Sequence, residues 1–181
     1  MHGEQKALLR TDLTAARRAR APGELDAARR AIQSAVLARC AQACWRCVAA
    51  YEPLPTEPGS RQLLAGLHGE GVSVIVPTLL ADNDLDWRHW HPDPAWPCPA
   101  LGVEAIALAD AVLVPALAVA ADGTRLGRGG GSYDRALARA AKVDVAALVF
   151  EEEFVGALPT DVWDRQVTAV VTPSGWRDLP G

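Results

Sequence analysis

The sequence predicts a three-layer α/β/α fold, in which a mostly parallel sheet is covered by helices on both faces. Continuous runs of β-branched and aliphatic residues, such as 72–76 and 111–114, are typical of parallel strands buried on both faces. These runs alternate along the chain with segments of helical periodicity, which favours helical crossovers between parallel strands. Half of the 181 residues are hydrophobic, so one domain over 1–181 can bury a sizeable core.

The first half of the chain is predicted to begin with a helical segment, residues 1–46, that packs on the rest of the domain. Pro22 and Gly23 divide this segment into two helices, because proline favours the first turn of a new helix. Ser60 is a candidate N-cap for a later helix. The elements expected here are helices at 5–20 and 24–45, a strand at 47–51, a helix at 61–68 and a strand at 72–76.

The second half repeats the alternation of strands and helices after a loop rich in proline and tryptophan. Asp122 and Gly123 are typical of a tight hairpin turn. The elements expected here are a loop at 82–99, a short helix at 103–109, a strand at 111–114, a helix at 132–141 and strands at 145–150 and 167–171.

Charge and hydropathy exclude several classes of protein. The net charge of −4 argues against a general nucleic-acid binder. The longest uncharged apolar run, residues 111–121, has eleven residues and contains Pro115, which is too short for a membrane span. No apolar stretch follows Met1, so we expect no secretory signal and a cytoplasmic protein. Residues 1–46 carry +5 and the rest −9, so the first segment either attracts an anionic ligand or forms a solvated helix face.

Cysteines and histidines supply no convincing metal site. Cys40, Cys44 and Cys47 have the spacing of a four-iron cluster motif, but they lie in an alanine-rich stretch without glycine or proline. At helical spacing they share one face, which predicts buried, reduced thiols. His89 and His91 are too few ligands for zinc.

The most informative segment is residues 125–135, Arg-Leu-Gly-Arg-Gly-Gly-Gly-Ser-Tyr-Asp-Arg. Four glycines in five positions before a helix free the backbone to turn its N–H groups toward one point, which predicts a phosphate cradle. Arg125 and Arg128 supply charge for phosphate oxygens, and Asp134 is placed to hold magnesium. A lysine after the glycines, as in a Walker A loop, is missing, and Ser132 replaces the last glycine of a dinucleotide fingerprint.

On these residues the sequence resembles the 5-formyltetrahydrofolate cyclo-ligase family, also called methenyltetrahydrofolate synthetases. The family's hallmark, Arg-Leu-Gly-x-Gly-x-Gly-x-Tyr-Asp after a strand ending in Pro-(Gly/Ala)-Leu-Ala, is matched by residues 125–134 after 114–118. Further matches, in family order, are Lys6 with Arg10, Tyr51 with Glu57, and Leu158-Pro159 with Asp164.

The resemblance implies an enzyme that uses ATP and Mg²⁺ to close 5-formyltetrahydrofolate to 5,10-methenyltetrahydrofolate, with release of ADP and phosphate. Its partners would be small molecules, ATP and a reduced folate, and we expect a monomer that binds neither nucleic acid nor membrane. It implies ATP binding by Lys6, Arg10, Arg125, Leu126, Gly127, Arg128, Gly129, Gly130, Gly131, Ser132, Tyr133 and Asp134. It implies metal binding by Asp134 and Asp164, folate binding by Glu52, Glu57 and Tyr133, and catalytic roles for Arg128 and Tyr133.

Four departures from the family pattern lie on the folate side. Ser132 stands where a first tyrosine is often found, Trp163 where histidine or asparagine often precedes the aspartate, and Pro53 where serine is frequent. Residues 93–99 lack the usual Glu-Pro pair. These departures leave two alternatives open, a non-catalytic folate- or nucleotide-binding protein and an ATP-dependent enzyme with another substrate. A sugar-phosphate isomerase or acyl-transfer enzyme on a related scaffold ranks last, since it rests on fold analogy alone.

Overall fold

The structure is a computed structural model that describes residues 2–140, 143–161 and 163–180. A seven-stranded sheet lies at its centre, in the order β10-β9-β7-β4-β1-β2-β3. The five inner strands are parallel, which confirms the predicted α/β class. They are β1 (Cys47–Ala49), β2 (Ser73–Leu79), β4 (Ala111–Pro115), β7 (Asp144–Leu148) and β9 (Ala169–Thr172). The edge strands β3 (Leu85–His89) and β10 (Gly175–Asp178) are antiparallel to their neighbours.

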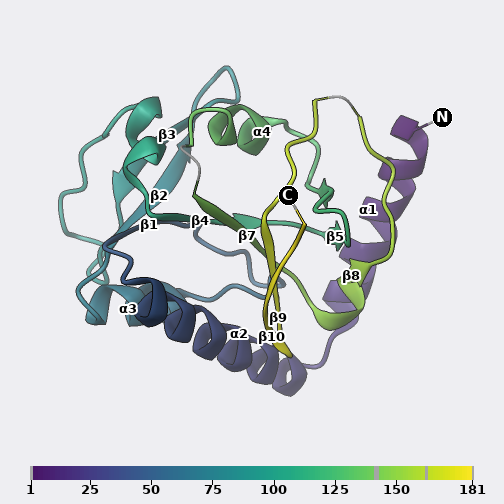
Figure 1. Cartoon of the computed structure of the whole chain (residues 1–181), viewed down its shortest axis with the longest axis horizontal. Helices are drawn as coiled ribbons and strands as arrows, with labels where there is room; N and C mark the ends of the chain where they lie inside the picture. Colours follow the sequence, from purple (N-terminus) through teal and green to yellow (C-terminus); the bar gives the residue numbers. More distant parts are fainter. Residues whose placement is uncertain (1, 141–142, 162, 181) are drawn as a thin grey trace.

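Helices cover both faces of this sheet (Figure 1). The helices α2 (Pro22–Ala43) and α3 (Arg61–Gly69) lie on one face. The short α4 (Ser132–Leu137) and the 3₁₀ helix η1 (Val103–Leu108) lie on the other. A second sheet, β6-β5-β8, lies beside the main one, and α1 (His2–Ala19) runs along the outside of this end of the molecule. Its strands are β5 (Ala118–Ala120), β6 (Arg125–Leu126) and β8 (Phe154–Val155).

Alternation of apolar side chains in the inner strands creates two hydrophobic cores. In β4, Ala111 and Leu113 join the cluster under α2 and α3, whereas Val112 and Val114 join the cluster under η1 and α4. All four are buried. Strands that are apolar on both faces need cover on both sides, which is why the chain crosses over on each side of the sheet.

The order of the parallel strands determines where a ligand can bind. Numbered along the chain, the parallel strands run 2-1-3-4-5 across the sheet, so the direction of winding reverses between β1 and β4. In open α/β sheets this reversal opens a crevice beyond the carboxyl ends of the two strands, where ligands bind.

Several sequence expectations differ from the structure. The predicted loop at 82–99 contains β3, in which Leu85 and Trp87 are buried. The charged Asp86 and Arg88 alternate with them, so the segment has no continuous apolar run that would predict a strand. The helix expected at 132–141 ends earlier, at Leu137, and residues 141–142 lie outside the described part of the chain. Neither β10 nor β8 was predicted, because their few residues carry no clear period.

The expectation of three buried cysteines on one helix face is wrong for two of them. Cys40 is buried, but Cys44 is exposed and ends α2 in the left-handed conformation with φ +55°. Cys47 already belongs to β1. Among the described residues, no group of three or more histidine, cysteine or acidic side chains is arranged to hold a metal ion.

Two further expectations concern the hairpin and the membrane. The hairpin at Asp122 and Gly123 is confirmed, because β5 and β6 pair antiparallel across it. Gly123 has φ +86°, and a Cβ there would lie 2.5 Å from the Val167 carbonyl oxygen. In the described part of the chain, no helix has the length and apolar character needed to span a bilayer.

Candidate active site

A cavity of about 1000 Å³ opens at the end of the sheet where β1 and β4 lie side by side. Residues far apart in the sequence line it together. They come from α1 (Lys6, Arg10), the loop after β1 (Glu57), the end of β4 and the turn after it (Pro115, Ala116, Leu117), and the glycine loop with the start of α4 (125–135). Asp161, Trp163, Asp164 and Arg165 complete the lining. The predicted phosphate cradle is therefore one wall of a larger pocket.

The glycine loop is shaped by contacts with two arginines. Gly129 has φ +100°, and a Cβ there would lie 3.4 Å from Cζ of Arg10. A Cβ at Gly127 would lie 2.8 Å from Nη1 of Arg125. The Nε of Arg10 donates to the Gly127 carbonyl at 2.8 Å. Because α4 has only six residues, these guanidinium groups, rather than a helix dipole, supply most of the positive charge.

Lys6 of α1 is buried in an ion-pair cluster. Its Nζ lies 2.7 Å from Asp161 Oδ2 and 2.6 Å from Asp164 Oδ2. Burial acts to lower the pKa of Lys6, but hydrogen bonds and charge from both aspartates outweigh it and raise that pKa. Burial likewise acts to raise the pKa of Asp164, and Lys6 outweighs it, so that pKa is lowered. Lys6 and Asp164 therefore stay charged.

Arg125 and Asp134 form a second ion pair inside the cavity. Nη2 of Arg125 lies 3.0 Å from Oδ1 of Asp134, which also accepts from the backbone N–H of Arg165 at 3.2 Å. The side chain of Arg125 is 5% exposed. Its Nη1 donates to the Pro115 carbonyl at 3.3 Å, so the glycine loop is fixed to the end of β4.

The carboxylates of Asp134 and Asp164 are the candidate ligands for a magnesium ion that would enter with phosphate groups. Each uses one oxygen, Oδ1 of Asp134 and Oδ2 of Asp164, for its hydrogen bonds to the described residues. Among the described residues, the second oxygen of each carboxylate has no hydrogen-bond partner and could coordinate an ion. Magnesium is commonly bound by one or two carboxylates together with water and substrate phosphates, so two oxygens suffice here.

Glu57 is a buried carboxylate that faces the glycine loop. Its Oε1 accepts from Nη2 of Arg128 at 3.1 Å, and its Oε2 accepts from the backbone N–H of Leu54 at 2.9 Å. Arg29 of α2 donates to the carbonyls of Pro55 and Glu57 and thereby holds this loop. Nε of Arg128 also donates to Oε1, at 3.4 Å. A carboxylate has about four acceptor positions, so Glu57 retains about one for a ligand while Arg128 is bound to it. Arg128 links the glycine loop to the Glu57 side of the cavity.

Tyr133 brings an unpaired hydroxyl to the cavity. Its oxygen is buried and has no hydrogen-bond partner among the described residues. Burial raises the pKa of Tyr133, despite the opposing charge of Arg125, so the hydroxyl keeps its proton. A buried hydroxyl without a partner is costly, and a ligand relieves that cost only if Tyr133 turns its oxygen into the cavity.

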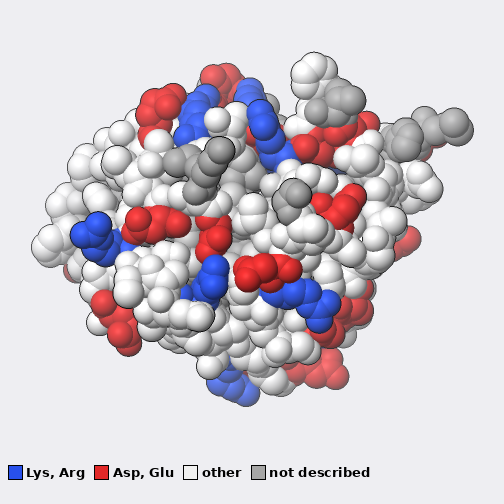
Figure 2. Space-filling view, viewed as in Figure 1, with Lys and Arg blue, Asp and Glu red and all other residues white. Residues whose placement is uncertain are grey.

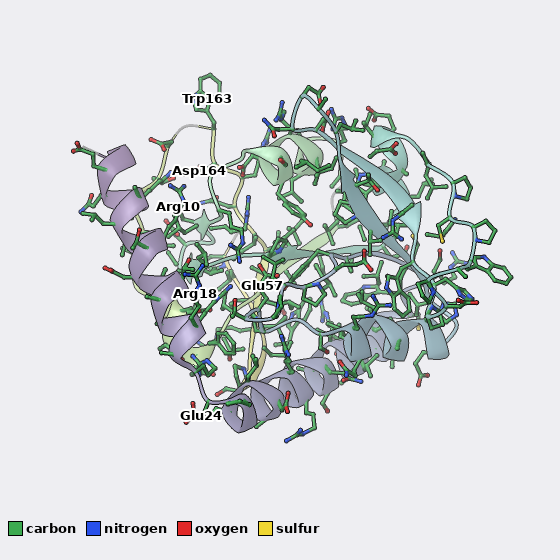
Figure 3. All side chains as sticks on the ribbon, turned by 180° about the vertical axis from the view of Figure 1, so that it is seen from behind. Arg10, Arg18, Glu24, Glu57, Trp163 and Asp164 are labelled. Carbon is green, nitrogen blue, oxygen red and sulfur yellow. The ribbon has the colours of Figure 1, made fainter. Side chains whose placement is uncertain are left out.

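Most of the predicted site residues meet in this cavity, but Glu52 does not. Glu52 lies at the surface, where it pairs with Arg88 at 2.6 Å and Arg61 at 3.5 Å. Figure 3 shows Arg10 and Asp164 on the same side of the molecule, with Trp163 projecting outward beyond them. Trp163 is 82% exposed and lies at the rim of the cavity.

Sequence reasoning missed several residues of the site. Asp161, which pairs with Lys6, carried only the weak signal of an acid three residues before Asp164. Leu79 and Leu85 line the apolar side of the cavity, and nothing in the sequence distinguishes them from leucines elsewhere in the chain.

Four of the nine basic residues of the first segment pair with acids of the body. Lys6, Arg17, Arg20 and Arg39 all form ion pairs with acids that follow residue 140. Figure 2 accordingly shows basic and acidic groups interspersed on one face. Part of the charge asymmetry therefore serves intramolecular pairing, and Lys6 and Arg10, which line the cavity, remain candidates for attracting an anionic ligand.

The fold and cavity define an α/β protein in which a cationic glycine loop and a buried carboxylate face one ligand pocket. The model of the 5-formyltetrahydrofolate cyclo-ligase family matches residues 2–173, and the chain belongs to this family. A 5-formyltetrahydrofolate cyclo-ligase of Mycolicibacterium smegmatis is 40% identical over 147 residues, which are 71% of this chain and 74% of that protein. Family membership makes the protein a ligase.

Two solved structures share the fold. The 5,10-methenyltetrahydrofolate synthetase of Mycoplasma pneumoniae superimposes with a TM-score of 0.77 at 21% identity, over 91% of this chain and 96% of that one. The 5,10-methenyltetrahydrofolate synthetase of Aquifex aeolicus gives a TM-score of 0.74 at 24% identity, over 97% and 93% of the two chains.

Proposed function

We propose that this protein uses ATP to close 5-formyltetrahydrofolate to 5,10-methenyltetrahydrofolate, with release of ADP and phosphate. The γ-phosphoryl group passes to the formyl oxygen, N10 attacks the activated carbon, and phosphate leaves. The proposal rests on the observation that Arg128 of the glycine loop contacts Glu57 within one shared cavity. A nucleotide phosphate and a folate ring can therefore meet in one place.

On the nucleotide side, Lys6, Arg10 and residues 125–134 are proposed to hold the phosphates. Phosphoryl transfer depends mainly on positioning and on neutralising charge, which clustered cations provide. Asp134 and Asp164 are proposed to hold Mg²⁺, which would supply further charge neutralisation at the phosphate oxygens. Arg128 has a side chain 48% exposed and is therefore freer than Lys6 or Arg125 to follow the transferring group.

On the folate side, Glu57 is proposed to receive the paired N–H donors of the pterin ring when Arg128 turns from it toward the phosphates. Tyr133 is proposed to donate its unpaired hydroxyl at the reacting end. Glu52, which lies at the surface and not in the cavity, drops out of this assignment.

The test is an absorbance assay that follows the methenyl product in the near ultraviolet, with 5-formyltetrahydrofolate and Mg-ATP. We expect a signal that requires ATP and disappears when magnesium is chelated. Absence of turnover, with ATP still raising the melting temperature, would contradict the proposal and favour another substrate or a non-catalytic binding protein.

A matched pair of variants tests the folate side. We expect Glu57→Gln to raise the KM for the folate by about tenfold or more while the KM for ATP stays within about twofold, because a charged acceptor is lost from a buried site. Glu52→Gln removes a carboxylate of the same kind at the surface and should leave both constants unchanged. Equal effects of the two substitutions would remove Glu57 from the folate site.

A further inference from the structure

The helix that carries Lys6 and Arg10 is attached to the body in an unusual way. Among the described residues of α1, the buried side chains are Lys6 and Arg17, both charged. Neither hydrophobic cluster includes a described residue of α1, and Leu8 is 67% exposed. The position of α1, at the outside of the molecule beside β5 and β8, therefore depends on polar contacts (Figure 1).

The most buried of these contacts lies between Arg17 and Glu153. Nε of Arg17 lies 2.7 Å from Oε1 of Glu153, and Nη2 lies 2.7 Å from Oε2. The two side chains are 1% and 3% exposed. The Oε2 atom also accepts from the backbone N–H of Phe150 at 2.8 Å, so the carboxylate is fixed by its own segment. A two-point pair of this kind determines the orientation of a side chain as well as its distance.

The same guanidinium reaches the wall of the cavity. Nη2 of Arg17 donates to the Ala116 carbonyl at 2.6 Å, and Ala116 lines the cavity directly after β4. Neither Arg17 nor Glu153 lines the cavity itself. Arg17 therefore connects α1 both to the segment after β7 and to the turn that leads into the site.

Helix geometry transmits this anchor to the cations of the site. Arg17, Arg10 and Lys6 are seven and four residues apart, so they lie on one face of α1. At a rise of 1.5 Å per residue, Lys6 is about 16 Å along the axis from Arg17, so a tilt of about 4° at Arg17 moves Lys6 by about 1 Å. A displacement of that size is enough to weaken a geometrically demanding phosphate site.

We infer that Arg17 and Glu153 are positioning residues of the nucleotide site, which hold α1 so that Lys6 and Arg10 face the glycine loop. The inference rests on the proposed function in naming ATP as the ligand. It assigns to this buried ion pair a role in ligand affinity that acts through α1, in addition to its contribution to stability.

The experiment compares Arg17→Lys with Arg20→Lys in the full-length protein. Arg17→Lys keeps a buried positive charge opposite Glu153 but loses the two-point geometry. Arg20 pairs with Glu152 from the same end of the helix, and Glu152 is 59% exposed. By calorimetry with a non-hydrolysable ATP analogue, we expect Arg17→Lys to weaken binding by about tenfold with unchanged folate affinity, and Arg20→Lys to change it by less than about twofold.

Two further measurements separate positioning from simple destabilisation. In an Arg10→Ala background the additional loss caused by Arg17→Lys should fall well below tenfold, because the group it positions is gone. Amide hydrogen exchange over residues 5–13, measured without ligand, should be faster in Arg17→Lys than in Arg20→Lys. If Arg17→Lys does not fold, Glu153→Gln is measured against Glu152→Gln in the same way.

The outcomes distinguish this inference from the proposed function. Equal analogue affinity in Arg17→Lys and the wild type would overturn the inference, as would an equal loss of folate and nucleotide affinity. Wild-type protein that binds the analogue but does not close the folate ring would instead overturn the proposed function and leave the positioning role standing.

Discussion

Four of the cations that line the cavity differ in how firmly their side chains are held. Lys6 is enclosed by two aspartates, and Arg125 is bonded both to Asp134 and to a backbone carbonyl. Arg10 is bonded to the glycine loop itself. Arg128 is half exposed and has one carboxylate partner. The first three preorganise the pocket, whereas Arg128 can change partners when a ligand arrives.

At this scale we expect Arg128→Ala to lower kcat by about 100-fold, since one donor to a transferring phosphoryl group is lost. Steady-state kinetics with saturating ATP and folate measure the effect. Arg30→Ala, which removes an exposed arginine on α2, is the matched control and should be neutral. A loss of less than about threefold would show that Arg128 is an ordinary surface charge.

The glycine loop offers a second test at the scale of single residues. Gly129→Ala places a Cβ at φ +100° and 3.4 Å from Cζ of Arg10. This conformation costs an L-residue about 1–2 kcal/mol. The unliganded loop should relax away from it, and ATP binding must then restore it, so ATP affinity should fall by about tenfold. Gly130→Ala, where φ is not positive and the nearest atom is 3.6 Å away, should change it by less than about twofold. Equal losses in the two variants would contradict this account of the loop.

At the scale of elements, an ion pair joins the start of β3 to the end of α4. Asp84 accepts two hydrogen bonds from Arg139, one of them at 2.9 Å, and one from its neighbour Leu85. The hydrogen bond from Arg139, together with that from the Leu85 backbone, lowers the pKa of Asp84 to about 2 from 3.8. The pair holds the two elements that cover the apolar side of the cavity.

The lowered pKa predicts how this contribution depends on pH. A depressed folded-state pKa stabilises the fold above the unfolded value of 3.8, and this stabilisation is lost as pH falls through about 2. We therefore expect Asp84→Asn to be less stable than the wild type at pH 5–7, with the difference shrinking between pH 4 and pH 2. Denaturant unfolding across this range measures it. A difference that does not depend on pH would assign the effect to packing.

At the scale of the whole molecule, two cores share one sheet, so the site depends on both. The loop that carries Glu57 follows β1, and the chain reaches the glycine loop through the small sheet after β4. Because β1 and β4 are neighbours at the reversal of winding, the two walls of the cavity rest on adjacent strands. A substitution that weakens the packing of either core should therefore also disturb the geometry of the cavity.

We expect Ile106→Ala to lower the free energy of unfolding by about 2–5 kcal/mol, because this side chain is fully buried in the core under η1. Leu108→Ala lies in the same 3₁₀ helix at 74% exposure and should change it by less than about 0.5 kcal/mol. Denaturant titration checks both values. A second transition that appears in Ile106→Ala would contradict the shared sheet as one cooperative unit.

Local patterns in the sequence determined the fold class, most of the helices and inner strands, and the glycine loop. These features depend on neighbours within a few residues, such as the β-branched run that becomes β4 or the glycines that turn at Gly129. The edge strand β3 was not predicted, because it is a strand through its pairing with β2 and not through a recognisable hydrophobic pattern of its own. The end of α2 at Cys44 was not predicted either, because no glycine or proline marks that turn.

Only the tertiary structure decided which charged groups meet. Lys6 pairs with Asp164 across 158 positions, Arg17 with Glu153 across 136 and Arg128 with Glu57 across 71. It also separated Glu57, which enters the cavity, from Glu52, which lies at the surface. A sequence shows that such residues exist, but their distances follow from how helices and strands pack on the sheet, and at atomic range a few ångströms separate a ligand-binding carboxylate from a solvated one.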